Sequence, residues 1–159
     1  MDHIVLAEGS DPERGSGPVT QTGKDKVIVT QYRAYNHPKS GSIVYKLQYA
    51  GKSIVYATDI ESYAEGDRRL IQFAKGADIL IHDAQYTMEQ YTGPMTTQGF
   101  GHSTPEMACK VAKEAGVKQL VLYHHDPNQD DAMVAAKEEG AKKLFPNTIA
   151  AYEGLTINL

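Results

Sequence analysis

The sequence predicts an α/β fold, a mixed β-sheet with helices on its outer face. Short alternating segments joined by turns fill the first third of the chain and are typical of neighbouring strands in hairpins. Helix–strand units follow, and the apolar run 120–123 is typical of a strand that is covered on both faces. Strands followed by helix–strand units favour one sheet with helices packed against it. A chain of 159 residues is expected to form one such domain.

The first elements are a polar segment and three strands. Residues 9–25 are rich in Gly, Ser, Asp, Pro and Thr, and we expect residues 1–25 to form a loop or flexible arm ahead of a domain at 26–159. Strands are predicted at 27–32, 43–49 and 54–58. A turn at 36–41 joins the first two, and a hairpin turn at 50–52 joins the second and third.

Helix–strand units follow the hairpin. A short helix is predicted at 69–75, and a buried strand at 79–81 leads into His82 and Asp83. Residues 85–100 mix aromatic, polar and Gly residues, so we expect a long loop over the site. Near the carboxyl end, a helix at 131–142 and one or two closing strands within 147–159 complete the prediction.

The stretch 101–127 contains the best-defined helix and strand. Ser103 and Glu106 have capping-box spacing, and Pro105 occupies an early position that helices tolerate. The helix carries a narrow apolar stripe of small residues and ends at Gly116. The buried strand at 120–123 then ends on His124 and His125, only one of which can face a given site in regular strand geometry. The stripe consists of Ala108, Val111, Ala112 and Ala115.

Composition excludes several classes of protein. No apolar run approaches the roughly 20 residues of a membrane span, and the first residues do not form a signal peptide, so a cytoplasmic protein without membrane contact is expected. A net charge of −4 gives no general attraction to nucleic acid. The single cysteine, Cys109, excludes an internal disulfide and is interpreted as a buried core residue.

Polar residues follow several predicted strands. His37 lies in a turn, Asp59, Asp83 and His124 close strands, and His102 precedes the capped helix. Taken singly, each is more often an ordinary turn or cap residue than a ligand. Imidazole and carboxylate together suit zinc, iron or manganese. His37, Asp59, Asp83 and His124 each follow a strand or lie in a turn, and four such positions occur in one chain. A metal site is therefore as plausible an interpretation as a set of turn residues.

Four segments taken in order resemble the second half of the metallo-β-lactamase fold, nearest to its RNase Z-like and phosphodiesterase-like branches. The resemblance covers 27–159 and implies the carboxyl-terminal half of an αββα sandwich. The segments are Tyr56-Ala-Thr-Asp-Ile-Glu61, Ala77-Asp-Ile-Leu-Ile-His-Asp-Ala-Gln-Tyr-Thr87, Gly101-His-Ser-Thr104 and Leu120-Val-Leu-Tyr-His-His-Asp-Pro127.

This resemblance implies roles for the polar residues. His37, Asp59 and His124 would bind divalent metal, with zinc preferred over iron or manganese, and Asp59 would bridge two ions. His102, assisted by Asp83, would protonate the leaving group, although RNase Z-like members commonly have Glu at the second position. The implied activity is hydrolysis of a phosphodiester or a carboxylic ester by metal-bound hydroxide, with a small molecule or a phosphodiester as substrate.

One family motif is missing from the sequence. The first half of the fold supplies His-x-His-x-Asp-His, and no His-x-His occurs in this chain. We therefore expect a hydrolase with impaired activity. The alternative is a non-catalytic half-domain that self-associates as a homo-oligomer, such as a dimer, or complements a second chain carrying the missing half. Nucleic acid is not expected as a partner.

Overall fold

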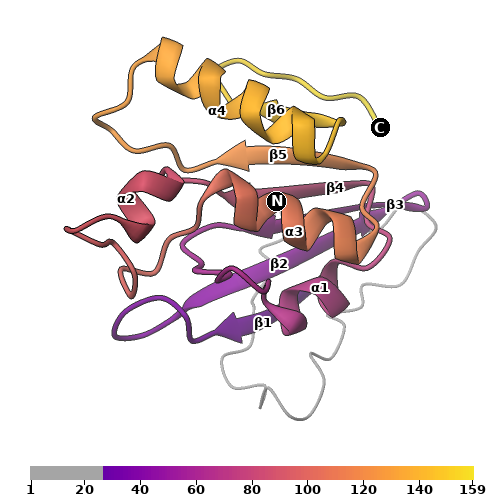
Figure 1. Cartoon of the computed structure of the whole chain (residues 1–159). Helices are drawn as coiled ribbons and strands as arrows, with labels where there is room; N and C mark the ends of the chain where they lie inside the picture. The colour runs from indigo at the N-terminus through magenta and orange to yellow at the C-terminus, as the bar shows by residue number, and fades with distance from the viewer. Residues whose placement is uncertain (1–26) are drawn as a thin grey trace.

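The computed structural model describes residues 27–159 and contains one mixed sheet with helices on one face (Figure 1). The arm predicted at 1–25, and residue 26, lie outside the described residues. Six strands follow one another across the sheet in chain order. The predicted fold class, an α/β mixed sheet with helices outside, is confirmed.

The first three strands are antiparallel and the last three are parallel. β1 (Ile28–Ala34), β2 (Ser42–Tyr49) and β3 (Lys52–Ala57) form a meander. The β2–β3 turn uses Ala50 and Gly51, both at positive φ (47° and 78°), as a tight hairpin turn requires. Parallel pairing adds β4 (Ile79–Asp83), β5 (Gln119–Tyr123) and β6 (Thr148–Ala150).

The topology places the carboxyl ends of five strands at one edge of the sheet, because β6 runs parallel to β5 as well, and four of these strands lead into candidate site residues. Since β1 and β3 both pair antiparallel with β2, they run in the same direction as each other. β4 and β5 run parallel to β3. The carboxyl ends of β1, β3, β4 and β5 therefore meet at the edge where α2 lies in Figure 1. This edge is where an open α/β sheet commonly builds a site.

Helices α1 (Arg68–Ala74), α3 (Pro105–Ala115) and α4 (Asp131–Leu144) cover one face of the sheet. The predicted stripe of small residues on α3 is buried, which lets α3 lie close to β4 and β5. Gly116 ends α3 in the left-handed conformation (φ 63°), as predicted. The core fills the space between these helices and the strands, with Leu80 and Leu120 fully buried.

Several predicted boundaries differ from the structure. Thr104 caps α3 in place of Ser103, because the Thr104 side chain accepts from the Met107 N–H while Pro105 takes the first helical position. The predicted loop at 85–100 contains a short helix, α2 (Met88–Thr92). β4 extends through His82 and Asp83, and only Thr148–Ala150 forms a closing strand.

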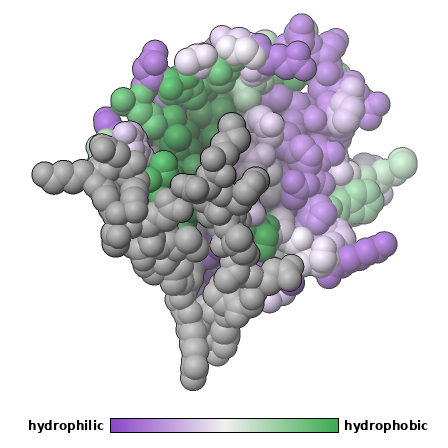
Figure 2. Space-filling view, turned by 180° about the vertical axis from the view of Figure 1, so that it is seen from behind, coloured by the Kyte–Doolittle hydropathy of each residue, from purple (hydrophilic) through white to green (hydrophobic). Residues whose placement is uncertain are grey.

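The sheet face opposite the helices is apolar and carries no helix from the described part of the chain. Apolar side chains gather over this face when the molecule is seen from behind (Figure 2). A hollow of about 370 Å³ there is lined mainly by apolar side chains, among them Leu47, Tyr49 and Ile54. Within residues 27–159, no helix is long and apolar enough to cross a membrane.

A candidate metal centre at the strand ends

Five predicted site residues converge at the shared strand edge. His37 follows β1, Asp59 follows β3, and Asp83 is the last residue of β4. His124 directly follows β5, and His102 lies in the segment before α3. These residues are up to 87 positions apart in sequence (124 minus 37), so only the sheet topology brings them together.

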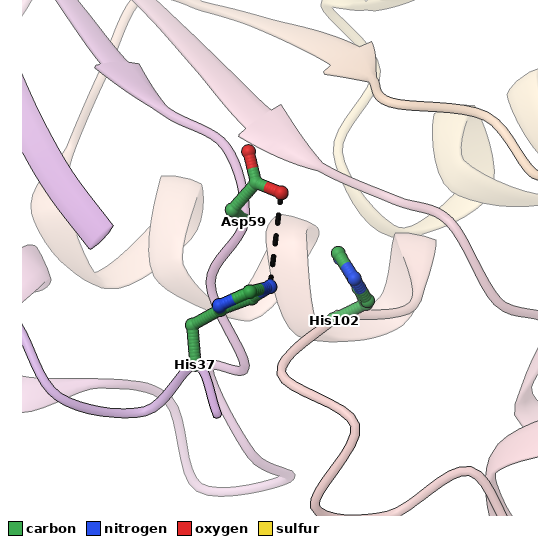
Figure 3. A group of neighbouring side chains, drawn as sticks. All are labelled: His37, Asp59 and His102. Atoms are coloured by element: carbon green, nitrogen blue, oxygen red, sulfur yellow. Dashed lines mark ion pairs between the residues drawn. The ribbon is translucent and has the colours of Figure 1, made fainter. Parts of the chain in front are cut away.

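The Asp59 carboxylate lies between two imidazoles. Its Oδ1 is 3.8 Å from His37 Nε2 and 4.0 Å from His124 Nε2. Figure 3 shows the His37 ring turned toward Asp59, with His102 beside them. Both separations are longer than a hydrogen bond. They leave the nitrogen and oxygen donors close enough for a cation to join them.

The donor set fits a divalent metal of the zinc type. Imidazole nitrogen and carboxylate oxygen are its usual protein ligands. The three side chains are 28%, 46% and 36% exposed in the order His37, Asp59 and His124, so the ligand atoms face an accessible space. One possible ligand atom from each of His37, Asp59 and His102 also lies within 4.8 Å of the other two, close enough for all three to share a cation. His102 is thus a second possible nitrogen donor beside its predicted catalytic role.

Asp83 is the buried centre of the site. Its Oδ2 accepts from His102 Nδ1 (2.8 Å) and His124 Nδ1 (3.0 Å). Oδ2 also accepts from the Asp59 N–H, at 3.1 Å. The Oδ1 atom accepts from the backbone N–H groups of Gln85 and Ser103. One fully buried carboxylate therefore holds residues from three separate segments of the chain.

These hydrogen bonds determine the ionisation of Asp83. Burial, the largest single influence, acts to raise the pKa of Asp83. The hydrogen bonds from His102, His124 and Ser103 together outweigh burial and lower that pKa well below its ordinary value. The carboxylate is therefore ionised at neutral pH and serves only as an acceptor.

An ionised Asp83 also determines which imidazole nitrogens carry protons. Both Nδ1 atoms must donate to it, so Nε2 of His124 faces Asp59 and is left for a ligand. The hydrogen bond to Asp83 raises the pKa of His124 above its ordinary value. This arrangement matches the common pattern in which a carboxylate orients a metal-binding imidazole from behind.

Two of the proposed ligands adopt a left-handed backbone. Asp59 has φ 52° and His124 has φ 58°. Side chains other than Gly rarely adopt this conformation, and it costs of order 1 kcal/mol or more for each residue. At both positions the turn comes directly after a strand and redirects the side chain at the sheet edge. Strained backbone at these two positions therefore coincides with the candidate site.

A buried polar network behind the site was not predicted. His82 Nδ1 donates to its neighbouring carbonyl at Asp83, so its Nε2 accepts from the Ser62 hydroxyl at 2.8 Å. Ser103 Oγ donates to the Ile60 carbonyl and accepts from the Ser62 N–H. Burial lowers the pKa of His82, which keeps that imidazole neutral. Ser103 therefore ties the loop after Asp59 to the segment carrying His102.

The lysines at 137, 142 and 143 predict a solvated helix face, and for Lys137 this prediction is wrong because the residue is buried. Its ammonium donates to the Ala84 and Gln85 carbonyls and to Gln129 Oε1, next to the end of β4. Burial lowers its pKa to about 8. A lysine three residues after Val134 and four before Ala141 occupies an apolar-stripe position of the helix. That placement was the available signal for a buried lysine.

Sequence comparison identifies the family. Residues 18–125 match the Beta-lactamase superfamily domain, so the chain belongs to the β-lactamase superfamily. It is 36% identical over 109 residues to a "Ribonuclease Z" of Archaeoglobus fulgidus, covering 69% of this chain and 33% of that relative. A "Ribonuclease Z" of Bacillus subtilis is 34% identical over 110 residues, with the same coverage. The chain spans about a third of the length of these curated relatives.

Solved structures support the same fold. The metallo-β-lactamase fold protein YhfI of Bacillus subtilis superposes with a TM-score of 0.68 at 24% identity, over 87% of this chain and 51% of that one. The short form of human tRNase Z gives a TM-score of 0.67 at 22% identity, over 93% and 48%. The predicted resemblance to the metallo-β-lactamase fold and its RNase Z-like branch is confirmed.

Proposed function

We propose that the chain is the part of a metal-dependent phosphodiester hydrolase that carries the leaving-group acid and some of the metal ligands. One observation carries the proposal: Asp83 accepts hydrogen bonds from both His102 and His124. The same carboxylate thereby orients a proposed metal ligand and a proposed proton donor. An ordinary set of turn residues would have no reason to share one buried carboxylate.

His37, Asp59 and His124 would hold the metal, with zinc preferred and iron or manganese as alternatives. When bound, such a cation supplies a nucleophile from water near neutral pH and offsets negative charge in the transition state. The residues themselves orient the ligand atoms. Asp83 directs His124 Nε2 toward Asp59, and Asp59 Oδ1 faces both imidazoles.

His102 would act as the general acid. Its Nδ1–H donates to Asp83, which orients the ring and leaves Nε2 to present a proton to the leaving oxygen. After transfer, the neutral ring keeps its Nδ1–H on Asp83. His102 is only 12% exposed and packs against the His37 and His124 rings, with centroids 5.2 Å and 4.9 Å away. This packing holds the donor beside the proposed metal ligands.

An RNA phosphodiester is the preferred substrate class. The sequence relatives are named as ribonucleases, which favours nucleic acid as a partner. This argues against our expectation from the sequence that nucleic acid is not bound. The net charge of −4 supplies no general attraction to RNA. Recognition would then depend on contacts close to the scissile phosphate rather than on a broad basic surface.

Metal content is the decisive experiment. Protein purified without chelator should contain one or two equivalents of divalent metal by mass spectrometry, and His37→Ala and His124→Ala should each lower that content. His125→Gln serves as control, because it changes the neighbouring imidazole that donates no hydrogen bond to Asp83. Hydrolysis of bis(p-nitrophenyl) phosphate is measured on the same protein preparations. Absence of bound metal in every preparation would overturn the proposal for this chain.

A non-catalytic role is the second candidate, favoured by the apolar sheet face. Leu47, Tyr49 and Tyr123 lie on this face with 38%, 50% and 40% of their surfaces exposed. Tyr56 and Tyr123 pack edge to face there, at 5.9 Å. A patch of this kind on a sheet favours association with a second copy or with a chain that supplies His-x-His-x-Asp-His.

A further inference from the structure

Glu61 is a buried carboxylate beside the candidate metal centre that the proposed mechanism does not use. Only 1% of the surface of Glu61 is exposed. It accepts from the Tyr91 hydroxyl at 2.6 Å, from the Gly99 N–H at 3.0 Å and from the Gly101 N–H at 3.1 Å. Tyr91 belongs to α2, and Gly99 and Gly101 belong to the segment between α2 and α3. Glu61 therefore holds both α2 and this segment to the loop after Asp59.

The held segment packs directly on a proposed metal ligand. Gly101 adopts φ 90°, and a Cβ placed there would lie 2.6 Å from His37 Cδ2 and 2.8 Å from His37 Cα. Only glycine permits this approach. The backbone at Gly101 therefore lies against His37 on one side and continues into His102 on the other.

Phe100 is the residue between the two glycines that Glu61 holds. Its own N–H donates to the Thr97 carbonyl at 3.1 Å, so three consecutive amides of this segment are fixed. The Phe100 side chain nevertheless leaves 57% of its surface exposed. A single exposed aromatic ring is common on protein surfaces. The Phe100 ring lies two residues before the proposed acid, on a backbone fixed by hydrogen bonds. It is therefore preorganised for binding, because its backbone has little conformational entropy left to lose.

We propose that the Phe100 ring is a stacking platform for a nucleobase of the substrate beside the scissile phosphodiester, with Glu61 as its positioning residue. This inference rests on the proposed function for its substrate class. Base–aromatic stacking accepts any base, because each base has a π-face. It would supply the local recognition that a chain of net charge −4 does not obtain from a basic surface.

Binding of AMP and of ribose 5-phosphate to the protein as purified tests the platform. The two probes share sugar and phosphate and differ in the base. Phe100→Ala should weaken AMP binding about tenfold, the size expected for one stacked base, and leave ribose 5-phosphate binding unchanged. Phe100→Trp should restore AMP binding. Met95→Ala is the matched control, since Met95 is 91% exposed in the same segment but lies farther from His102 along the sequence.

The positioning role of Glu61 has its own variants. Glu61→Gln places an NH₂ group among the N–H donors, so it should weaken AMP binding severalfold and leave ribose 5-phosphate binding unchanged. Glu65→Gln, on the exposed surface nearby, removes the same charge and should change neither constant. If Glu61→Gln lowers the thermal midpoint too far for binding measurements, the surface variants at Phe100 still decide the proposal.

The outcomes separate this inference from the proposed function. Equal AMP affinity in the wild-type protein and Phe100→Ala, or no AMP binding to the wild type, overturns the platform even if bis(p-nitrophenyl) phosphate is hydrolysed. Selective loss of AMP binding in Phe100→Ala supports the platform even if no diester is cleaved. In that case the proposed hydrolysis fails and nucleotide recognition remains.

Discussion

Asp83 is the residue on which the candidate site depends most. It is fully buried, and its two oxygens accept from two imidazoles and three backbone amides. A buried carboxylate with this many donors is stabilised in the charged form despite its desolvation. The site therefore has a fixed negative charge at its base, and the orientation of His102 and His124 follows from that charge.

Asp83→Asn should impair both metal binding and proton transfer. The amide NH₂ would face imidazole N–H groups, so His124 and His102 lose the acceptor that orients them. We expect zinc affinity to fall by about 10–100-fold and diester hydrolysis by at least about 100-fold. Asp78→Asn is the control, because Asp78 lies just before the other end of β4 and binds Ser53 and Lys118. Equal losses in both variants would contradict a specific role for Asp83.

The raised pKa of His124 predicts how metal binding depends on pH. A proton on Nε2 competes with the metal, so apparent zinc affinity should increase by about tenfold per pH unit until His124 loses its proton. That increase should continue above pH 6.5, the ordinary pKa of the side chain, because Asp83 stabilises the charged ring. In the metal-free protein this stabilisation is fully present below pH 6.5 and is lost as pH rises through the folded-state pKa.

Competition with a chelating dye between about pH 5.5 and 8.5 measures this dependence. Asp83→Asn should move the midpoint back toward 6.5, since it removes the group that raises the pKa. A midpoint below 6.5 in the wild-type protein would show that burial, which acts to lower the pKa of His124, outweighs the hydrogen bond.

At the scale of elements, the segment between α2 and α3 links the acid to the metal ligands. It carries His102, and at Gly101 it packs on His37. Gly101→Ala should therefore displace His37 and lower zinc affinity, besides straining the backbone at φ 90°. Gly99→Ala is a close control, because Gly99 has φ 82° and open space where a Cβ would be.

Backbone strain at positive φ should cost each variant about 1 kcal/mol of stability or more, and Gly101→Ala should lose more than Gly99→Ala because its Cβ would also meet Pro38 and His37 atoms. Only Gly101→Ala should change the zinc dissociation constant, measured by calorimetry, and the thermal midpoints provide the comparison of stability. A similar change of affinity in Gly99→Ala would mean that loop strain, and not contact with His37, controls the ligand.

The elements themselves could largely be predicted from the sequence because each depends on local pattern. Apolar runs such as 120–123 indicate buried strands, and a polar residue after each run indicates an edge where side chains meet. The choice of Thr104 over Ser103 as cap could not be predicted, since both can cap and only the tertiary contacts of Ser103 with Ile60 and Ser62 decide. Likewise, hydrogen bonds of Asp83 and Glu61 to distant segments leave no periodic signal.

At the scale of the whole molecule, the two faces of the sheet are unequal. Helices α1, α3 and α4 bury one face, whereas on the opposite face apolar side chains gather around the hollow lined by Leu47, Tyr49 and Ile54 (Figure 2). Alternation along β2 explains the difference: Val44 packs in the core, and Leu47 and Tyr49 point to the other side. Water contact over such a surface is unfavourable by about 25 cal/mol for each Å² of apolar area.

Within residues 27–159, this imbalance predicts self-association through the apolar sheet face. Leu47→Glu combined with Tyr49→Glu should shift the protein toward monomer in sedimentation velocity, since each charge would be desolvated in the interface. Leu144→Glu and Met133→Glu, on exposed positions of α4, add the same charge on the helical side and should leave the distribution unchanged. Association that persists in the sheet-face variant, or dissociates equally in both, would assign the contact to another surface. A monomer in all three proteins would show that this apolar face is tolerated in water.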